Sequence, residues 1–123
     1  MTDRNVKRVL VVEDEFLVAL HLEDLLTAMG HHVVGPAHRI NQALDLARTS
    51  EIDFAVLDIN LAGDRSFPVA DILRERGIPF VFATGYGADG LIDGYRHEMA
   101  LRKPYVAREL ADAIARAAPP LIR

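Results

Sequence analysis

The chain has 123 residues, a length that suits one domain and is short for two. Its 18 acidic and 14 basic side chains give a net charge of −4, which argues against the basic surface of a nucleic-acid-binding protein. Cysteine is absent, which excludes disulfide frameworks and thiolate metal sites, and no apolar run approaches the ~20 residues of a membrane span. We therefore expect one cytoplasmic domain over residues 1–123, without a nucleic-acid or membrane partner.

Short apolar runs typical of buried strands alternate with longer segments of helical period in the first half of the chain. "RVLVV" at 8–12 is the first strand candidate, and a helix at 15–29 follows it and ends at Gly30. A short strand at 32–37 and a helix at 40–49 come next.

The second half repeats this alternation. A strand at 54–58 ends on an acid, and the helix at 68–77 begins with proline and ends with glycine, which is the favoured polarity. The remaining elements, in chain order, are a strand at 79–84, a weak helix at 91–99, a short strand at 100–102 and a strong helix at 106–118.

Strands that are apolar on both faces and separated by helices indicate a parallel sheet covered on both sides, which is the α/β class. Five strands and five helices fit this length. In such sheets the functional crevice lies beyond the carboxyl ends of the strands. The residues at which the strands stop are therefore the candidates for function.

Polar side chains from distant parts of the sequence follow these strand ends. They are Glu13 and Asp14 after the first strand, Asp58 at the end of the third, Thr84 at the end of the fourth and Lys103 after the fifth. Taken singly, each has a simpler interpretation. The acid pair would cap the next helix, Asp58 would be a turn residue, and Lys103 would be a surface residue.

Taken together, these groups point to phosphoryl chemistry. Two carboxylates ~4 Å apart repel each other by roughly 4 kcal/mol at an effective dielectric constant of about 20, so a cluster of acids needs a cation or a raised pKa. Oxygen ligands without a nearby histidine or cysteine suit Mg²⁺. Asp58 is then a nucleophile that accepts a phosphoryl group, while Mg²⁺, Thr84 and Lys103 offset the charge.

The ordered set of motifs resembles the receiver domain of two-component response regulators over essentially the whole chain. The resemblance implies a flavodoxin-like (βα)5 doubly wound fold with strand order 2-1-3-4-5. It also implies that Asp58 is phosphorylated by a histidine kinase or a histidine phosphotransfer protein. By the family pattern Asp14, Asp58 and the backbone carbonyl of Asn60 bind Mg²⁺ directly, with Glu13 acting mainly through water.

The resemblance further implies that Thr84 and Lys103 contact the phosphoryl group and that the peptide bond before Pro104 is cis. The sequence also departs from the commonest receiver pattern. Many receivers carry a Tyr or Phe switch residue three positions before the lysine, where this chain has Ala100. The usual Met-Pro after the phosphorylated aspartate is replaced by "NLAG" at 60–63.

The stretch "PFVFATGYG" at 79–87 looks like the receiver subclass named for its Phe-Ala-Thr-Gly motif (FATGUY), which is often linked to the HWE class of histidine kinases. We expect the switch to involve Thr84 and Gly85. Two glycines weaken the predicted helix that follows, and our hypothesis is that phosphorylation orders residues 85–98. The alternative is that these glycines only permit a tight turn.

The first predicted helix is more apolar than one buried face requires. Phe16, Leu17 and Leu20 lie beside its core stripe, and some of these side chains must point outward near the acid cluster. We expect them to contact the protein that delivers the phosphoryl group. The alternative is that neighbouring loops cover them.

Three functions are weighed on these residues. The leading one is a stand-alone receiver without an output domain, which promotes only its own phosphorylation and dephosphorylation and is not a turnover enzyme. A second is a Mg²⁺-dependent phosphohydrolase with an aspartyl-phosphate intermediate, although such enzymes usually carry the nucleophile on the first strand. A third is a pseudo-receiver that binds proteins without phosphorylation, against which the complete set of site residues speaks.

Overall fold

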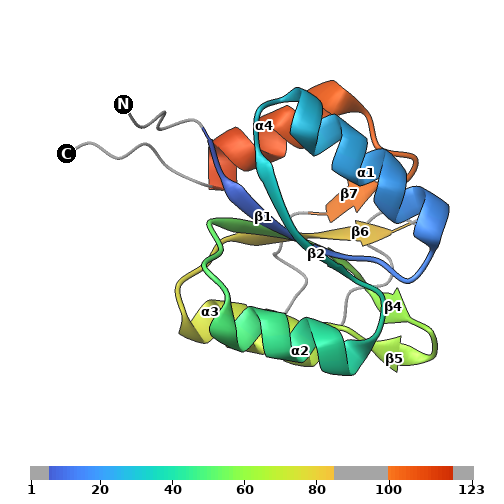
Figure 1. The fold of residues 1–123 in the computed structure, drawn as a ribbon, viewed down its shortest axis with the longest axis vertical. Helices are drawn as coiled ribbons and strands as arrows, with labels where there is room; N and C mark the ends of the chain where they lie inside the picture. The colour runs from blue at the N-terminus through green and yellow to red at the C-terminus, as the bar shows by residue number, and fades with distance from the viewer. Residues whose placement is uncertain (1–5, 85–99, 118–123) are drawn as a thin grey trace.

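A five-stranded parallel sheet with helices on both faces forms the molecule in the computed structural model, which describes residues 6–84 and 100–117 (Figure 1). The sheet consists of β1 (Arg8–Val12), β2 (His32–Ala37), β3 (Phe54–Asp58), β6 (Phe80–Thr84) and β7 (Ala100–Arg102). Their spatial order is β2-β1-β3-β6-β7, and every neighbouring pair is parallel. Because β6 and β7 are the fourth and fifth strands of this sheet along the chain, the expected order 2-1-3-4-5 is confirmed.

The described helices cover the sheet in two pairs. They are α1 (Phe16–Ala28), α2 (Ile40–Thr49), α3 (Phe67–Glu75) and α4 (Ala107–Ala117). In Figure 1, α1 and α4 lie on one face of the sheet, and α2 and α3 lie on the other. This arrangement is the doubly wound, flavodoxin-like fold that the sequence predicts.

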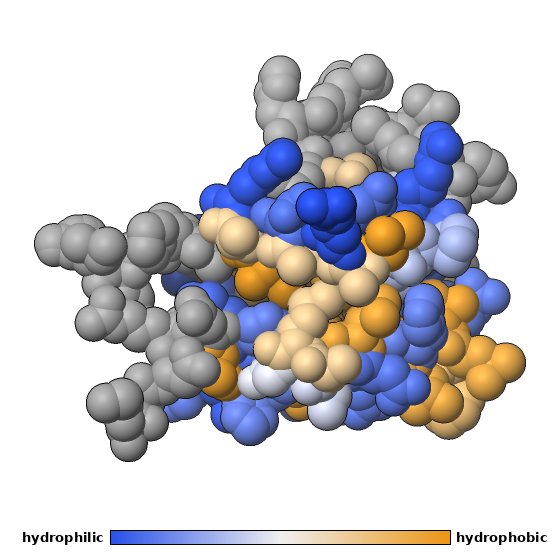
Figure 2. Space-filling model, turned by 90° about the horizontal axis from the view of Figure 1, so that it is seen from above, coloured by the Kyte–Doolittle hydropathy of each residue, from blue (hydrophilic) through white to orange (hydrophobic). Residues whose placement is uncertain are grey.

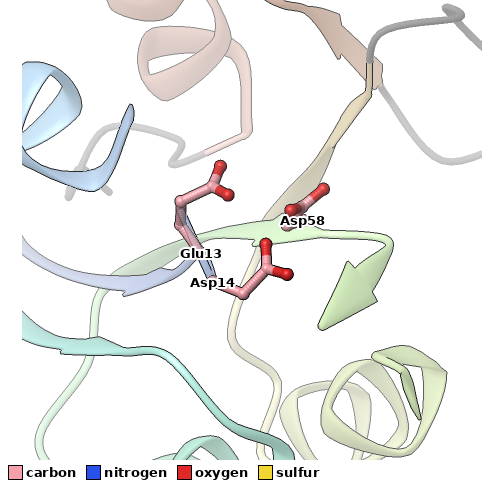
Figure 3. A group of neighbouring side chains, drawn as sticks. All are labelled: Glu13, Asp14 and Asp58. Atoms are coloured by element: carbon pink, nitrogen blue, oxygen red, sulfur yellow. The ribbon is translucent and has the colours of Figure 1, made fainter. Parts of the chain in front are cut away.

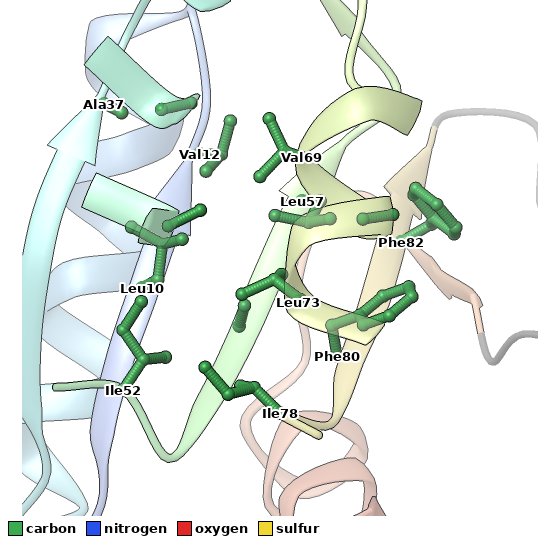
Figure 4. Packing of buried hydrophobic residues seen from close by; sticks show 14 of the residues in the cluster. Leu10, Val12, Ala37, Ile52, Leu57, Val69, Leu73, Ile78, Phe80 and Phe82 are labelled. Atoms are coloured by element: carbon green, nitrogen blue, oxygen red, sulfur yellow. The ribbon is translucent and has the colours of Figure 1, made fainter. Parts of the chain in front are cut away.

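Alternation along the buried strands produces two separate apolar layers. On β1, Leu10 and Val12 belong to the layer beneath α2 and α3, whereas Val9 and Val11 belong to the layer beneath α1 and α4. All four side chains are at most 1% exposed. Figure 4 shows the first of these layers, with side chains of the strands meeting those of the helices. Successive residues of a strand point to opposite faces, so a strand buried on both sides is apolar throughout.

Most element bounds agree with the sequence expectations within one or two residues. The helix expected at 15–29 is Phe16–Ala28, and the one expected at 68–77 is Phe67–Glu75. The weak helix expected at 91–99 lies outside the described residues. None of the helices in 6–84 and 100–117 has the length and apolar character that a membrane span requires.

A small antiparallel hairpin directly after β3 was not predicted. It consists of β4 (Asn60–Leu61) and β5 (Asp64–Arg65), joined by a two-residue turn. Both turn residues have positive φ, +50° at Ala62 and +96° at Gly63, as tight hairpin turns require. Strands of two residues carry no readable periodicity, and alanine is not a usual signal for such a turn, which is why sequence patterns miss this element.

Gly35 allows β2 to approach β1 closely near the site. Its φ is +97°, and a Cβ at this position would lie 2.8 Å from the Ala37 nitrogen and 3.2 Å from the Val11 carbonyl oxygen. The pairing of β1 with β2 shifts register between Leu10 and Val12, next to this glycine. The close approach brings the end of β2 beside the residues that follow β1.

Candidate functional site

Three carboxyl groups meet at the carboxyl edge of the sheet. Glu13 and Asp14 directly follow β1, and Asp58 is the last residue of β3, the strand that pairs with β1. One oxygen from each of the three lies within 4.8 Å of the others. Figure 3 shows the three side chains as neighbours at the ends of their strands. Parallel pairing of adjacent strands therefore places side chains 45 positions apart in one cluster, as the strand ends predict.

Lys103 supplies a positive charge to this cluster. It follows β7, and its Nζ lies 2.6 Å from Glu13 Oε1 and 3.2 Å from Asp58 Oδ2. The Lys103 backbone N–H donates to the Thr84 carbonyl oxygen at 3.0 Å, which ties the residue to the end of β6. The Lys103–Pro104 peptide bond is cis, the form that the resemblance implies. Thr84 itself is 6% exposed at this same edge.

The environment changes the acidity of the clustered groups. Burial, together with the Glu13 carboxylate, raises the pKa of Asp58 from 3.8 to about 7, although Lys103 opposes this shift. Burial also raises the pKa of Asp14, but the hydrogen bond from the Ala62 N–H and contacts with its acidic neighbours outweigh it, so that pKa lies below its usual value. Burial lowers the pKa of Lys103, yet its acidic partners raise it above the usual value. The lysine is therefore charged, and ionisation of Asp58 is disfavoured mainly by its burial.

The backbone around Glu13 is fixed by contacts from both sides. Its N–H donates to the Ala37 carbonyl oxygen at 2.9 Å, and its own carbonyl oxygen accepts from His38 Nδ1 at 2.8 Å. Glu13 Oε2 accepts from the Glu15 N–H at 3.1 Å, whereas the Glu15 side chain makes no capping bond to α1. The interpretation that the acid pair caps the next helix thus holds in part. The Glu13 carboxylate contacts the N–H of Glu15 at the start of α1, but it also contacts Lys103.

Two positioning contacts were missed by sequence reasoning. The Ala62 N–H donates to Asp14 Oδ2 at 2.9 Å, and His38 contacts the Glu13 carbonyl as described. His38 directly follows β2, so the rule that polar residues after strand ends gather at one edge could have found it. A backbone N–H leaves no signal in the sequence, so the role of Ala62 could not have been found in this way.

The donor set fits a hard divalent cation. All three clustered side chains offer carboxylate oxygens, and a single lysine, Lys103, faces them, so three carboxyl groups share one positively charged side chain. Oxygen-only sites of this kind suit Mg²⁺ or Ca²⁺ rather than zinc. Mg²⁺ typically takes one or two carboxylates and completes its shell with water and phosphate oxygens.

The other predicted site residues lie around this cluster. Asn60 begins β4 two positions after Asp58, and Ala100 is half-buried in β7, where it pairs with Phe82. Gly85 and the segment 85–98 lie outside the described residues. The structure brings no side chain of the proposed switch other than Thr84 to this edge within 6–84 and 100–117.

The expected docking residues are exposed next to the site. Phe16, Leu17 and Leu20 at the start of α1 are 68%, 75% and 41% exposed. Of these three, Leu17 lines a mostly apolar pocket of about 400 Å³, and Lys103 lies in the lining of the same pocket. Figure 2, which looks onto the face of α1 and α4, shows hydrophobic side chains gathered among hydrophilic ones. In the described part of the chain no loop covers these three side chains, contrary to the alternative considered from the sequence.

Comparisons with known proteins agree on one family. The family model described as response regulator receiver domain matches residues 9–115. The phyllosphere-induced regulator PhyR of Methylorubrum extorquens is 33% identical over 114 residues, which cover 89% of this chain and 42% of PhyR. The transcriptional regulatory protein PdtaR of Mycobacterium tuberculosis is 29% identical over 112 residues, covering 88% of this chain and 55% of PdtaR. The chain thus spans only about half the length of these relatives.

A solved structure of similar length is also related. The solution structure of SdrG from Sphingomonas melonis Fr1 has a TM-score of 0.79 and 38% identity, and the match covers 94% of this chain and 97% of SdrG. The BeF3-activated conformation of SdrG from Pseudomonas melonis Fr1 has a TM-score of 0.75 and 40% identity, with the same coverage of 94% and 97%.

Proposed function

Because the chain belongs to the response regulator receiver domain family of two-component systems, we propose that it accepts a phosphoryl group on Asp58 from a phosphohistidine of a kinase or phosphotransfer protein. The observation that carries this proposal is the position of Lys103 Nζ, 3.2 Å from Asp58 Oδ2, beside the Glu13–Asp14 pair. An aspartyl phosphate carries more negative charge than the free carboxylate, and Lys103, together with a cation held by the acidic side chains, would offset that added charge.

The transfer follows from the chemistry of these side chains. An Asp58 oxygen attacks phosphorus as the nitrogen–phosphorus bond of the donor breaks, and the leaving imidazole nitrogen keeps that electron pair and takes a proton from solvent. Lys103 stays paired with the carboxylate and is placed to meet the incoming oxygens, and Thr84 would donate its hydroxyl to them. Mg²⁺, held by Asp14, Asp58 and the Asn60 carbonyl with Glu13 acting through water, would neutralise charge on the phosphoryl oxygens.

The related SdrG supports this chemistry. A BeF3-activated conformation is described for SdrG, which is 40% identical to this chain, and beryllofluoride resembles a phosphoryl group in shape and charge. The motif Phe-Ala-Thr-Gly at 82–85 leads us to assign the chain to the FATGUY subclass, with a kinase of the HWE class as the expected donor. We further propose that the protein is not a turnover enzyme. It would promote only the phosphorylation of its own Asp58 and the later hydrolysis of that phosphate.

The partner would dock beside the site through the start of α1. Phe16, Leu17 and Leu20 are exposed there, and Leu17 lines the pocket that Lys103 also lines. Apolar surface next to a reactive group is well placed to receive a helix that presents the donor histidine.

Intact mass spectrometry after incubation with acetyl phosphate and Mg²⁺ tests the proposal. We expect a single acid-labile phosphate adduct on the wild type and none on Asp58→Asn, because the amide is not a nucleophile. Release of free phosphate from many substrates with steady turnover would favour the phosphohydrolase instead, and a wild type that forms no adduct would favour the pseudo-receiver.

A further inference from the structure

The β4–β5 hairpin contacts the acid cluster through its backbone, at Asp14, whereas Lys103 contacts the other two members, Glu13 and Asp58. Resting on the proposed function, we propose that the Ala62 N–H is a positioning group that holds the Asp14 carboxylate in place for Mg²⁺. The N–H donates to Asp14 Oδ2 at 2.9 Å, across 48 positions of sequence. This contact joins the segment after β3 directly to a proposed ligand that follows β1.

The hairpin is anchored firmly enough to position a side chain. Leu61 is 0% exposed and packs in the apolar layer beneath α2 and α3. Leu61 also pairs with Asp64, and the Ser66 N–H donates to the Ile59 carbonyl oxygen at 2.8 Å, which closes the base of the hairpin. The turn that carries Ala62 therefore has a fixed location relative to the core.

Ala62 adopts a conformation that is unfavourable for its residue type. Its φ is +50°, in the left-handed region that is unfavourable for a residue with a Cβ. In this conformation its N–H points at Asp14. The hydrogen bond to a carboxylate is of the stronger, charge-assisted kind, so it offsets this cost and ties the strained turn to the cluster.

Without this contact, repulsion would favour rotation of the Asp14 carboxylate away from the cluster. Asp14 is only half-buried, and the carboxylates of Glu13 and Asp58 repel it when they are ionised. The N–H keeps one oxygen occupied and limits rotation toward solvent, which leaves the group aimed at the position between the three carboxylates. Contacts of this kind behind a metal ligand are typically worth 10–100-fold in metal affinity.

The turn of this chain is what makes the contact available. In receivers that carry Met-Pro after the phosphorylated aspartate, the proline has no N–H to donate, whereas "NLAG" at 60–63 has an N–H at every position. Ala62 and its N–H thus lie in the stretch where this chain departs from the commonest receiver pattern.

Removing only the N–H is the sharpest test. Replacing Ala62 by its α-hydroxy analogue, lactic acid, turns the amide into an ester and keeps the side chain. We expect the Mg²⁺ dissociation constant from calorimetric titration to rise at least tenfold. The matched variant Ala62→Gly keeps the N–H and tolerates positive φ, so its Mg²⁺ affinity should stay within about twofold of the wild type.

A second measurement needs no metal. In metal-free protein, the Ala62 amide should exchange with solvent at least tenfold faster in Asp14→Ala than in the wild type, while the Ser66 amide, which donates to a backbone oxygen, should exchange unchanged. Equal exchange of the Ala62 amide in both proteins, or equal Mg²⁺ affinity of ester and wild type, would overturn the positioning role alone. A wild type that binds no Mg²⁺ would overturn the proposed function together with this role.

Discussion

Asp58 is the side chain at which function and stability oppose each other. It lies at the end of a strand that is buried throughout, beside a second carboxyl group, and its pKa is raised to about 7 by burial and by Glu13. A folded-state pKa above the ordinary value means that the folded protein binds this proton more tightly than the unfolded chain does. Stability from this group is therefore fully present at low pH and is lost as the pH rises toward 7 and beyond.

Replacing this carboxyl group should stabilise the metal-free protein in a pH-dependent way. We expect Asp58→Asn to raise the free energy of unfolding, measured in urea with EDTA, and the gain should be about 1 kcal/mol larger at pH 8 than at pH 5. The full pKa shift would correspond to more, but solvent screening of a partly accessible group reduces it. The exposed control Asp24→Asn should show the same small change at both pH values. A gain for Asp58→Asn that is larger at pH 5 would contradict this account of the cluster.

Sequence reasoning succeeds for residues whose position follows from strand ends and fails for those that act through the backbone. Glu13, Asp14, Asp58 and Lys103 were predicted to meet because parallel strands end at one edge, and they lie together. The contact of Ala62 with Asp14 depends on a turn with φ of +50°, and an alanine in the sequence does not indicate such a turn. The chemical roles of the four clustered side chains remain predictions.

At the scale of elements, hydrophobic periodicity in the sequence predicts the longer helices and strands and misses the very short strands. The strands of the sheet and the helices α1 to α4 were expected near their observed bounds because each carries several buried residues at regular spacing. The β4–β5 hairpin has two residues in each strand, so its pairing depends on a turn and on the burial of Leu61. The outward face of α1 was likewise predicted from an excess of apolar residues over one buried stripe.

A negative charge introduced on this outward face of α1 should distinguish docking of the kinase from the phosphoryl transfer itself. We expect Leu20→Asp to slow phosphoryl transfer from a cognate kinase about tenfold, as loss of ~1.4 kcal/mol of docking energy would. Phosphorylation by acetyl phosphate should be unchanged, because the small donor needs no docking surface. Both rates are measured by quantifying the phosphorylated protein over time.

The matched control is Thr27→Asp, which adds the same charge to an exposed position two turns further along α1. It should leave both rates unchanged. If Leu20→Asp slowed both donors equally, the side chain would matter for folding or for the site itself, and the docking role would be wrong.

At the scale of the whole molecule, the fold gathers three carboxyl groups at one edge of the sheet, where a bound cation would neutralise part of their negative charge. Three carboxyl groups face one lysine at the carboxyl edge of the sheet, while both faces of that sheet are closed by apolar layers. The sheet cannot relax to spread these charges without disturbing the core that holds its strands. A bound cation should therefore stabilise the whole domain.

We expect saturating Mg²⁺ to raise Tm at pH 7.5. At a concentration one hundred times the dissociation constant, binding contributes ~2.7 kcal/mol, which for a domain of this size corresponds to roughly 10 °C. Calorimetry with and without Mg²⁺ measures the shift. In Asp14→Asn the shift should be much smaller, and equal shifts in the two proteins would place the ion elsewhere.

The location of the phosphoryl group tests the central claim most directly. Borohydride reduces an aspartyl phosphate to homoserine, so protein incubated with acetyl phosphate, reduced and digested can be mapped by tandem mass spectrometry. The account predicts homoserine at position 58 alone, formed in the presence of Mg²⁺ and absent when EDTA replaces it. Homoserine at another aspartate, or equal labelling without a divalent cation, would contradict it.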